Sequence, residues 1–383
     1  MAQPHANNTA GNQPESSQHV VEDRNPAVFK QKWLVIDDIN IDLLSVLATF
    51  SAVVAVLLGY PAKAVVPITA ALVLPLRTFL PHPAVPQGLV LVTGGSSGIG
   101  AELSYIFASK GHDLVLVGRS DEQLEAVHTT IETRYGRKVY TVATDLSLPG
   151  AAKKLYDQIK GQGLTVDVLV NAAALGAAGD TMDQPLELVE RMTTLNCTAL
   201  VQLTQLFGRD MMSRRQGGWI LQVSSVLGKS SNVPERAARA NLVIGWMSSP
   251  GQNVYHATKH YVRSFCEALS VELRAHPNVV MTQLMPGPVR TQFVTRAHAE
   301  DTFIFAASHT VEEPSAVARA GYQGLCKRKR MVFSSWNAAF TATLMYLLPR
   351  SVHLTLARLT NAPMHGLVRA SEPDHDQKAR AEG

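Results

Sequence analysis

Tyr255 and Lys259, four positions apart, are the pair in this sequence with the clearest capacity for proton transfer. On a helix this spacing places both side chains on one face, about one turn apart. A free tyrosine has a pKa of about 10, so it is a poor acid or base at neutral pH unless a nearby ammonium group favours its ionised form. Tyr156 and Lys160 have the same spacing, and we interpret them as a solvated helix face. Only Tyr255 lies between a strand pattern ending in Ser-Ser and a Pro-Gly-x-Val-x-Thr segment, so we expect it to be the acid/base.

A second chemical feature is the glycine-rich loop TGGSSGIG, with glycines at Gly94, Gly98 and Gly100. The loop follows an apolar strand pattern and opens a helical one. Glycines there let the backbone turn tightly and approach a pyrophosphate, which then sits at the N-terminus of the helix. The next strand ends in LVGRS, where Arg119 can pair with a 2′-phosphate and the Ser96 hydroxyl can add a hydrogen bond. The loop therefore predicts a dinucleotide site that favours NADP(H) over NAD(H).

These residues need a scaffold, and the pattern after residue 88 alternates short apolar runs with longer amphipathic stretches. That rhythm indicates βαβ units and a parallel sheet. We expect an α/β protein with a doubly wound parallel sheet, a Rossmann fold, in a single catalytic domain. The six predicted strands are residues 89–93, 113–117, 138–144, 166–171, 219–224 and 279–285.

Five motifs in this order, TGGSSGIG, DVLVNAA, QVSS, YHATK and PGPVRT, resemble the classical short-chain dehydrogenase/reductase family. The resemblance covers residues 89–324 and is closest in type to the membrane-anchored carbonyl reductases of that family. It implies hydride transfer between C4 of a nicotinamide and a carbonyl carbon, with Tyr255 giving a proton to the developing alkoxide. One departure is that Asn171 begins Asn-Ala-Ala-Ala where the family usually has Asn-Asn-Ala-Gly. The changes are small and need not abolish binding.

The resemblance also implies roles for individual residues. Ser225 would hydrogen-bond and orient the substrate oxygen, with Ser224 as the alternative assignment. Asn196 matches the family's helix asparagine, which helps to hold a proton-relay water, and Asp145 would contact the adenine. The expected catalytic residues are Asn196, Ser225, Tyr255 and Lys259. The expected cofactor-binding residues are Thr93, Gly94, Ser96, Gly98, Ile99, Gly100, Arg119, Asp145, Asn171, Tyr255, Lys259, Val289 and Thr291, and no metal site is expected.

Composition limits the remaining interpretation. The formal charge of +4 over 383 residues is too small and too dispersed to indicate nucleic-acid binding. Three widely spaced cysteines exclude a disulfide scaffold and a cysteine-rich zinc module. Charged residues make up 17%, below the usual quarter, and residues 43–62 carry no formal charge at all. Twenty such residues are about what a helix needs to cross a bilayer, which predicts a membrane anchor.

Before the catalytic domain we expect a disordered tail at residues 1–28 and an anchor region at 29–88. Within the anchor region, the transmembrane helix is expected at about 43–62 and a second, interfacial or re-entrant apolar segment at 64–76. After the catalytic domain we expect a C-terminal extension at 325–370 that could lie at the membrane interface, and a polar tail at 371–383. A cleaved signal peptide and a buried core hairpin are the alternatives. Charges flanking the anchor weakly favour a cytosolic catalytic domain. The expected membrane is that of the endoplasmic reticulum. A glycan at Asn7, in the sequon Asn-Asn-Thr, would support one span, and its absence would leave a hairpin open.

An irregularity lies between the serine and the tyrosine. Ser225 and Tyr255 are 30 positions apart, where the resemblance leads us to expect about 13. One interpretation is an active-site lid. The other interpretation is a retained intron at residues 229–245, whose length is typical of short fungal introns. The codons of Gly228-Lys229-Ser230 can contain the donor-like sequence GTAAGT, and those of Ile244-Gly245 can contain a terminal AG. Sequencing the cDNA would decide between them.

The substrate region is expected at residues 292–310, where Phe293, Phe303 and Phe305 offer apolar contacts. Our leading hypothesis is an NADPH-dependent oxidoreductase that interconverts a ketone and a secondary alcohol on a lipophilic substrate, such as a secondary metabolite, steroid or lipid. The alternatives are reduction of a 3-ketoacyl or 3-ketosphingoid lipid, and a catalytically silent nucleotide-binding scaffold if residues 229–245 are present in the mature protein. The expected partners are the lipophilic small molecule and membrane lipid, without nucleic acid, and a homo-oligomer is allowed.

Overall fold

The computed structural model describes residues 61, 85–225, 250–291, 311–335, 338–339, 351–352 and 354–355. The chain divides into two compact units, Met1–Pro81 and His82–Gly383, and only the second is described in detail. The expected tail at 1–28, the apolar segments at 43–62 (Pro61 aside) and 64–76, the segment at 229–245, the substrate region at 292–310 and the polar tail at 371–383 lie outside the described residues.

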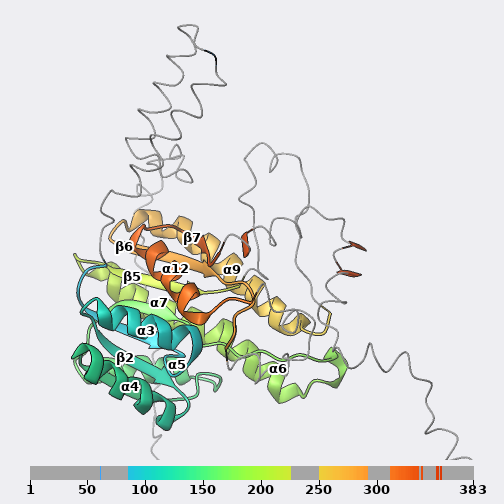
Figure 1. Cartoon of the computed structure of the whole chain (residues 1–383), viewed down its shortest axis with the longest axis horizontal. Coiled ribbons are helices and arrows are strands. Elements are labelled where there is room, and N and C mark those ends of the chain that lie inside the picture. Colours follow the sequence, from blue (N-terminus) through green and yellow to red (C-terminus); the bar gives the residue numbers. More distant parts are fainter. Residues whose placement is uncertain are drawn as a thin grey trace, which may run out of the picture. The chain divides into compact units, whose positions relative to one another are not determined.

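Seven parallel strands form one sheet in the order β3-β2-β1-β4-β5-β6-β7 (Figure 1). The strands are β1 Leu89–Thr93, β2 Asp113–Gly118, β3 Val139–Ala143, β4 Val166–Asn171, β5 Gly218–Val223, β6 Val279–Met285 and β7 Met331–Phe333. The strand order reverses at β1, between β2 and β4, which is the switch point at which doubly wound sheets bind ligands. The predicted Rossmann arrangement is therefore confirmed.

The sequence prediction differs from the observed sheet at its margins. Strands β3 and β5 end one residue earlier than expected, and β2 continues one residue further, to Gly118. The sheet also has a seventh strand, beyond the six expected, because α12 (Pro314–Cys326) leads into β7, which pairs with β6 up to Phe333. Three residues are too few for a clear periodicity signal, so β7 was not among the six expected strands.

Helices cover both faces of the sheet, and each face has its own apolar core. One core joins the sheet to α3 (Gly98–Ser109), α4 (Asp121–Tyr135) and α12, which lie together on the near face in Figure 1. The other joins it to α5 (Ala151–Gly161), α7 (Leu200–Ser213) and α9 (Asn253–Glu272). Burial on both faces explains why the central strands are nearly continuous runs of apolar residues.

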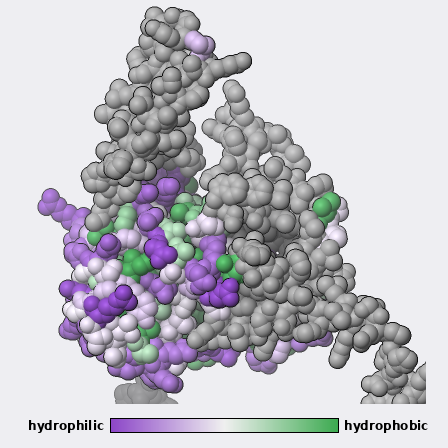
Figure 2. Space-filling view, in the orientation of Figure 1, coloured by the Kyte–Doolittle hydropathy of each residue, from purple (hydrophilic) through white to green (hydrophobic). Residues whose placement is uncertain are grey.

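The remaining described helices lead into α7 or follow α9. They are the short 3₁₀ helix η2 (Thr181–Asp183), α6 (Leu186–Thr193), the π-helical turn η3 (Thr194–Ala199) and the 3₁₀ helix η5 (Leu273–Ala275). Helices α6, η3 and α7 follow one another without a break in the chain. The visible face of the described domain is mainly hydrophilic with scattered apolar residues (Figure 2). None of the helices in the described ranges has the length and apolar character needed to span a membrane.

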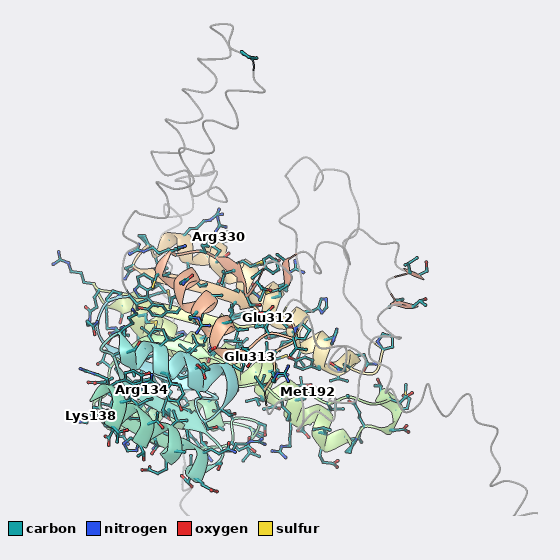
Figure 3. The ribbon with its side chains drawn as sticks, viewed as in Figure 1. Arg134, Lys138, Met192, Glu312, Glu313 and Arg330 are labelled. Carbon is teal, nitrogen blue, oxygen red and sulfur yellow. The ribbon has the colours of Figure 1, made fainter. Side chains whose placement is uncertain are left out.

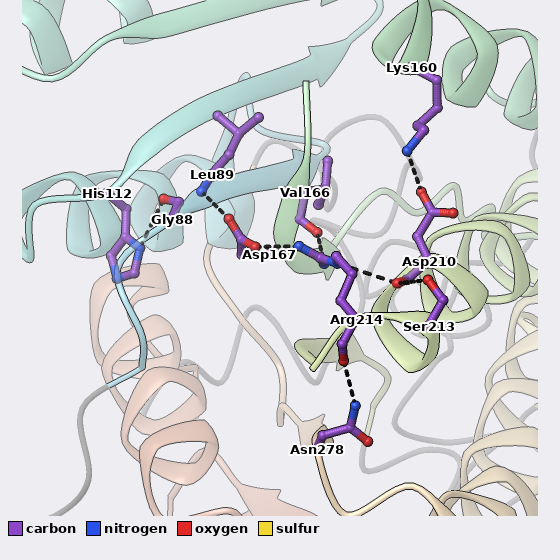
Figure 4. Close-up of polar contacts among 10 residues, drawn as sticks. All are labelled: Gly88, Leu89, His112, Lys160, Val166, Asp167, Asp210, Ser213, Arg214 and Asn278. Carbon is purple, nitrogen blue, oxygen red and sulfur yellow. Dashed lines mark hydrogen bonds and ion pairs between the residues drawn. The ribbon is translucent and has the colours of Figure 1, made fainter. Parts of the chain in front are cut away.

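A polar network ties together the amino ends of the strands (Figure 4). The Arg214 guanidinium at the end of α7 pairs with Asp167 of β4 at 2.6 Å, and Asp167 also accepts from the backbone of Leu89 in β1 at 3.0 Å. Arg214 further donates to the Val166 carbonyl, while its own carbonyl accepts from Asn278, just before β6. This network holds β1, β4 and β6 in register at the edge opposite their carboxyl ends, where the predicted site residues gather.

Candidate active site

The glycine-rich loop joins β1 to α3 and forms an open cradle at the switch point. Gly94 has φ +69°, and a Cβ added there would lie 2.9 Å from the Cα of Ala173. A Cβ on Gly100 would overlap the carbonyl oxygen of Gly94. The first turn of α3 carries no acidic residue, and Ser97 makes no side-chain cap. Its backbone N–H groups therefore suit an anionic ligand such as a pyrophosphate.

Two residues at strand ends fix the backbone segments next to this loop by hydrogen bonds. The Thr93 hydroxyl, at the end of β1, accepts from the backbone N–H groups of Ala172 and Ala173 at 3.1 and 3.2 Å. The Asn171 amide, at the end of β4, donates to Thr204 and Gln222, both at 3.1 Å. The segment after β4, in which alanines replace the family's usual residues, is thereby fixed beside the loop.

The expected adenine end lies at the ends of β2 and β3. Ser96 lies against Gly118, where a Cβ would come within 3.0 Å of the Ser96 Oγ, and Arg119 follows as an exposed residue. Asp145 accepts from the Ser147 hydroxyl at 2.6 Å and pairs with Arg191 at 2.8 Å. Burial raises the pKa of Asp145, but the hydrogen bonds from Ser147 and the Arg191 guanidinium outweigh it, so the pKa lies below its usual value. Asp145 is therefore a carboxylate at neutral pH.

Tyr255 and Lys259 lie on one face of α9, as their spacing predicted. The Lys259 Nζ is 5.5 Å from the Tyr255 ring centroid and donates to the Val223 carbonyl, at the end of β5, at 3.4 Å. Lys259 is 4% exposed, and burial lowers its pKa to about 8. Lys259 thus titrates within the range of pH over which enzymes are assayed.

Burial has the opposite effect on the tyrosine. It raises the pKa of Tyr255 above its ordinary value, so in the protein alone the hydroxyl keeps its proton. Loss of hydration is the cause of this shift, because it disfavours the charged tyrosinate. A protonated Tyr255 is the form that can donate to a developing alkoxide.

Asn196 lies in the π-helical turn η3 and joins the segment after β4 to α9. Its Oδ1 accepts from the Leu175 N–H at 2.8 Å, and its Nδ2 donates to the Leu175 carbonyl at 2.7 Å and to the Thr258 Oγ1 at 2.9 Å. The Thr258 hydroxyl donates to the Tyr255 carbonyl at 2.7 Å. Asn196 is thus bonded to Thr258, the residue that precedes Lys259 in α9. Its place in a π-helical turn is typical of functional sites.

The two serines after β5 are both buried. Ser224 donates its N–H to the Leu284 carbonyl at 2.9 Å, and its Oγ has no hydrogen-bond partner among the described residues. Ser225 is 7% exposed and follows Ser224 in the segment after β5. Both serines therefore follow the end of β5 at which Lys259 of α9 donates to the Val223 carbonyl.

The segment after β6 closes over the glycine loop. Val289 pairs with Glu312 in an isolated parallel bridge, and the Thr291 methyl lies against Gly98, 3.1 Å from where a Cβ would stand. The Glu312 carboxylate, labelled in Figure 3, accepts from the Ser335 hydroxyl at 2.7 Å. Val289 and Thr291 thus come from far along the chain to the expected nicotinamide end.

Comparison with known proteins agrees with this geometry. Residues 88–237 match the family described as short chain dehydrogenase. This part of the chain is therefore similar to the short-chain dehydrogenases. Domains of this class are NAD(P)-dependent oxidoreductases, and the fold, the glycine cradle and the α9 tyrosine are consistent with that class. The match ends inside the 229–245 segment.

Curated relatives and solved structures show the same similarity. The human dehydrogenase/reductase SDR family member 7 is 31% identical over 214 residues, covering 55% of this chain and 58% of that protein. A short chain dehydrogenase of Pseudocercospora fijiensis is 30% identical over 225 residues, covering 58% of this chain and 65% of that protein. The chain therefore spans about three fifths of the length of these curated relatives.

A solved short-chain dehydrogenase from Sphingobium yanoikuyae, in complex with NADPH, superposes with TM-score 0.55 and 27% identity over 69% of this chain and 97% of that chain. A 7beta-hydroxysteroid dehydrogenase structure superposes with TM-score 0.59 at 20% identity, which shows the fold alone. A nicotinamide cofactor fits the residues present, because the first turn of α3 has no acidic residue and no side-chain cap, and Arg119 is exposed at the end of β2.

Several residues that shape the site escaped the sequence reasoning. Thr258 connects Asn196 to the backbone of Tyr255, and Cys197 contacts the Thr258 carbonyl at 3.9 Å. Burial raises the pKa of the Cys197 thiol to about 11, so it stays protonated. In the sequence, the only indication that Thr258 belongs to the site is its position between Tyr255 and Lys259.

The second Tyr-x-x-x-Lys pair lies away from this site. The Tyr156 hydroxyl donates to Asp210 at 2.9 Å, and Lys160 pairs with the other Asp210 oxygen at 2.9 Å. Both interactions join α5 to α7, so this pair contributes to helix packing and does not lie on the fully solvated helix face that was expected.

Proposed function

We propose that this protein interconverts a ketone and a secondary alcohol on a lipophilic substrate with NADP(H) as the hydride carrier. The observation that carries the proposal is the single carboxyl edge at which the glycine cradle, the exposed Arg119, Asn196 and the Tyr255–Lys259 pair meet. The NADPH-bound Sphingobium structure, which this chain resembles over 97% of that chain, supports the choice of cofactor.

The residues of the chain divide the chemistry between them. A bound nicotinamide cofactor supplies the hydride. Tyr255, which burial keeps protonated, donates its hydroxyl proton to the oxygen of the reduced carbonyl. Ser225, or Ser224 as the alternative, orients that oxygen by a hydrogen bond. The Lys259 ammonium stabilises the tyrosinate that remains after the transfer, because an opposite charge within a few ångströms favours the ionised form.

Proton resupply follows the contacts of Asn196. Three hydrogen bonds to Leu175 and Thr258 hold its side chain in one orientation against α9. We assign it the role of holding a water through which Tyr255 regains its proton. In the reverse direction the same groups take a proton from an alcohol.

The proposal is tested by NADPH oxidation with a panel of lipophilic ketones, using the full chain in detergent or vesicles. Tyr255→Phe removes the proton donor and should lower kcat by at least about 100-fold, the usual contribution of a general acid. Tyr156→Phe is the matched control, because that tyrosine has the same spacing to a lysine but contacts Asp210 between α5 and α7. Unchanged turnover in Tyr255→Phe would refute the mechanism.

A second candidate, a silent nucleotide-binding scaffold, rests on the 229–245 segment, within which the family match ends. The same assay distinguishes it when the full chain is compared with a variant lacking residues 229–245. Tight NADPH binding without turnover of any ketone in both proteins would favour the scaffold. Turnover only in the shortened protein would favour the retained-intron interpretation, and turnover in both would favour a lid.

We also propose that residues 43–62 attach the protein to the endoplasmic reticulum membrane with the catalytic domain in the cytosol. The twenty uncharged residues support this proposal. Alkaline carbonate extraction should leave the full chain in the membrane pellet, and replacing the central Val53 and Val54 of this segment by lysine should release it. Recovery of the unaltered chain in the soluble fraction would contradict the anchor. A mobility shift of the Asn7 region on glycosidase treatment would report the side on which the tail lies.

A further inference from the structure

One helix carries contacts to both halves of the site. Arg191 lies in the last turn of α6, five residues before Asn196, and the helix continues between them into the π-helical turn η3. Asn196 binds Leu175 and Thr258 at the catalytic end. Arg191 instead reaches the loop after β3, where Asp145 lies.

The contacts of Arg191 use both ends of its guanidinium. Its Nη2 donates to the Asp145 Oδ2 at 2.8 Å, and its Nε donates to the Ser147 Oγ at 3.1 Å. The Ser147 hydroxyl and N–H both donate to the other carboxylate oxygen, Oδ1, at 2.6 and 2.9 Å. The three residues therefore form one closed set of four hydrogen bonds.

This set leaves Asp145 with little spare acceptor capacity. A carboxylate has about four lone-pair sites, two on each oxygen. Ser147 occupies both sites on Oδ1, and Arg191 occupies one on Oδ2. One acceptor site on Oδ2 remains, which suits a single N–H donor such as the exocyclic amino group of an adenine.

The charges around Asp145 also indicate a role for Arg191 in cofactor binding. Arg119 also lowers the pKa of Asp145, although less than Ser147 and Arg191 do. Without Arg191, the carboxylate would be unneutralised and would attract the Arg119 guanidinium to itself. Arg119 would then be a weaker partner for a 2′-phosphate, and the carboxylate would repel that phosphate.

We propose that Arg191 is a positioning residue for the adenosine half of the cofactor: it orients Asp145 toward the adenine and leaves Arg119 free for the 2′-phosphate. This inference rests on the proposed NADP(H) function and adds to it a second cation, on α6, that sets cofactor selectivity. Arg191 itself need not touch the cofactor.

The direct test is calorimetric binding of 2′,5′-ADP and of 5′-AMP to the full chain. Arg191→Ala should weaken 2′,5′-ADP by about tenfold and 5′-AMP by only about threefold, because the phosphate is the group that loses Arg119. Arg191→Lys keeps the charge but replaces the rigid planar fork with a single ammonium, so it should retain most of the preference for 2′,5′-ADP while weakening both ligands slightly.

The matched control is Arg137→Ala. Arg137 pairs with Asp113 at 2.6 Å, with side chains 35% and 38% exposed, compared with 43% and 24% for Arg191 and Asp145. The Arg137 pair lies at the amino end of β2, the far edge from the site. Its loss should change either affinity less than twofold.

A kinetic arm separates positioning from general damage to the helix. Turnover with reduced nicotinamide mononucleotide, which lacks the adenosine half, should be equal in wild type and Arg191→Ala, while kcat/KM for NADPH falls about tenfold in the variant. An equal loss with both cofactors, or an affinity of Arg191→Ala for 2′,5′-ADP within twofold of wild type, would overturn the inference. Wild-type protein that binds 2′,5′-ADP without any turnover would refute the proposed function alone, and absence of binding would refute both.

Discussion

The buried lysine of α9 should make the protein less stable than it would be without it. Lys259 is 4% exposed, and burial lowers its pKa from 10.5 to about 8. A lysine that is easier to deprotonate in the folded state than in the unfolded one costs folding free energy whenever it is charged. Lys259→Met, which keeps the length of the side chain but removes the charge, should therefore stabilise the fold while it abolishes turnover.

The magnitude follows from the pKa difference. The difference between the ordinary pKa of 10.5 and about 8, at about 1.4 kcal/mol for each pKa unit, corresponds to about 3 kcal/mol. The variant also loses the 3.4 Å hydrogen bond to the Val223 carbonyl, a loss of about 1 kcal/mol. The net gain is about 2 kcal/mol, which raises the Tm of a domain of this size by about 4–8 °C.

The gain should depend on pH in a defined direction. Between pH 8 and 10.5 the unfolded state binds more protons at this lysine than the folded state does, so wild-type stability rises with pH through that window. The advantage of Lys259→Met is therefore full below pH 8 and gone above pH 10.5. Wild-type kcat/KM should fall as pH rises past about 8, because the stabilising ammonium is lost.

Differential scanning calorimetry of the cofactor-free full chain at pH 7 and at pH 10.5 measures both effects. Lys160→Met is the matched control, since Lys160 is 44% exposed and pairs with Asp210 on the α5–α7 surface. That variant should gain no stability and keep its activity. The reasoning is refuted if Lys259→Met melts at or below the wild-type temperature at pH 7, or if its advantage is the same at both pH values.

Three further predictions follow from other contacts. Gly94→Ala places a Cβ 2.9 Å from the Cα of Ala173 at a φ of +69°, so NADPH affinity measured by fluorescence titration should fall more than tenfold, and unchanged affinity would contradict the cradle. Asn196→Ala removes three hydrogen bonds at the catalytic end, so kcat should fall about 10–100-fold with little change in the NADPH Kd, whereas an effect on Kd alone would disprove its catalytic placement. Arg214→Ala leaves the Asp167 carboxylate without its guanidinium partner, and chemical denaturation should show a loss of about 2–3 kcal/mol with kcat preserved, a result that an unchanged midpoint would exclude.

Much of the architecture was predictable from local pattern. Alternating apolar runs predicted six of the seven strands, because a strand buried on both faces must be apolar along its length. The loop glycines were predictable as well, since the backbone conformation at Gly94 and the close approach at Gly100 admit no side chain. The motif order located Tyr255 and Lys259 on one helix face.

Tertiary structure alone decided the properties that depend on distant neighbours. Spacing cannot show that burial raises the pKa of Tyr255 and lowers that of Lys259, because burial depends on what β5 and η3 place against α9. It cannot show either that Arg191 meets Asp145, 46 positions earlier in the chain. The amino-acid sequence thus determined which chemical groups this protein has and which elements carry them. Folding determined which groups touch and which are dehydrated, and those two conditions set the charges on which proton transfer and cofactor choice depend.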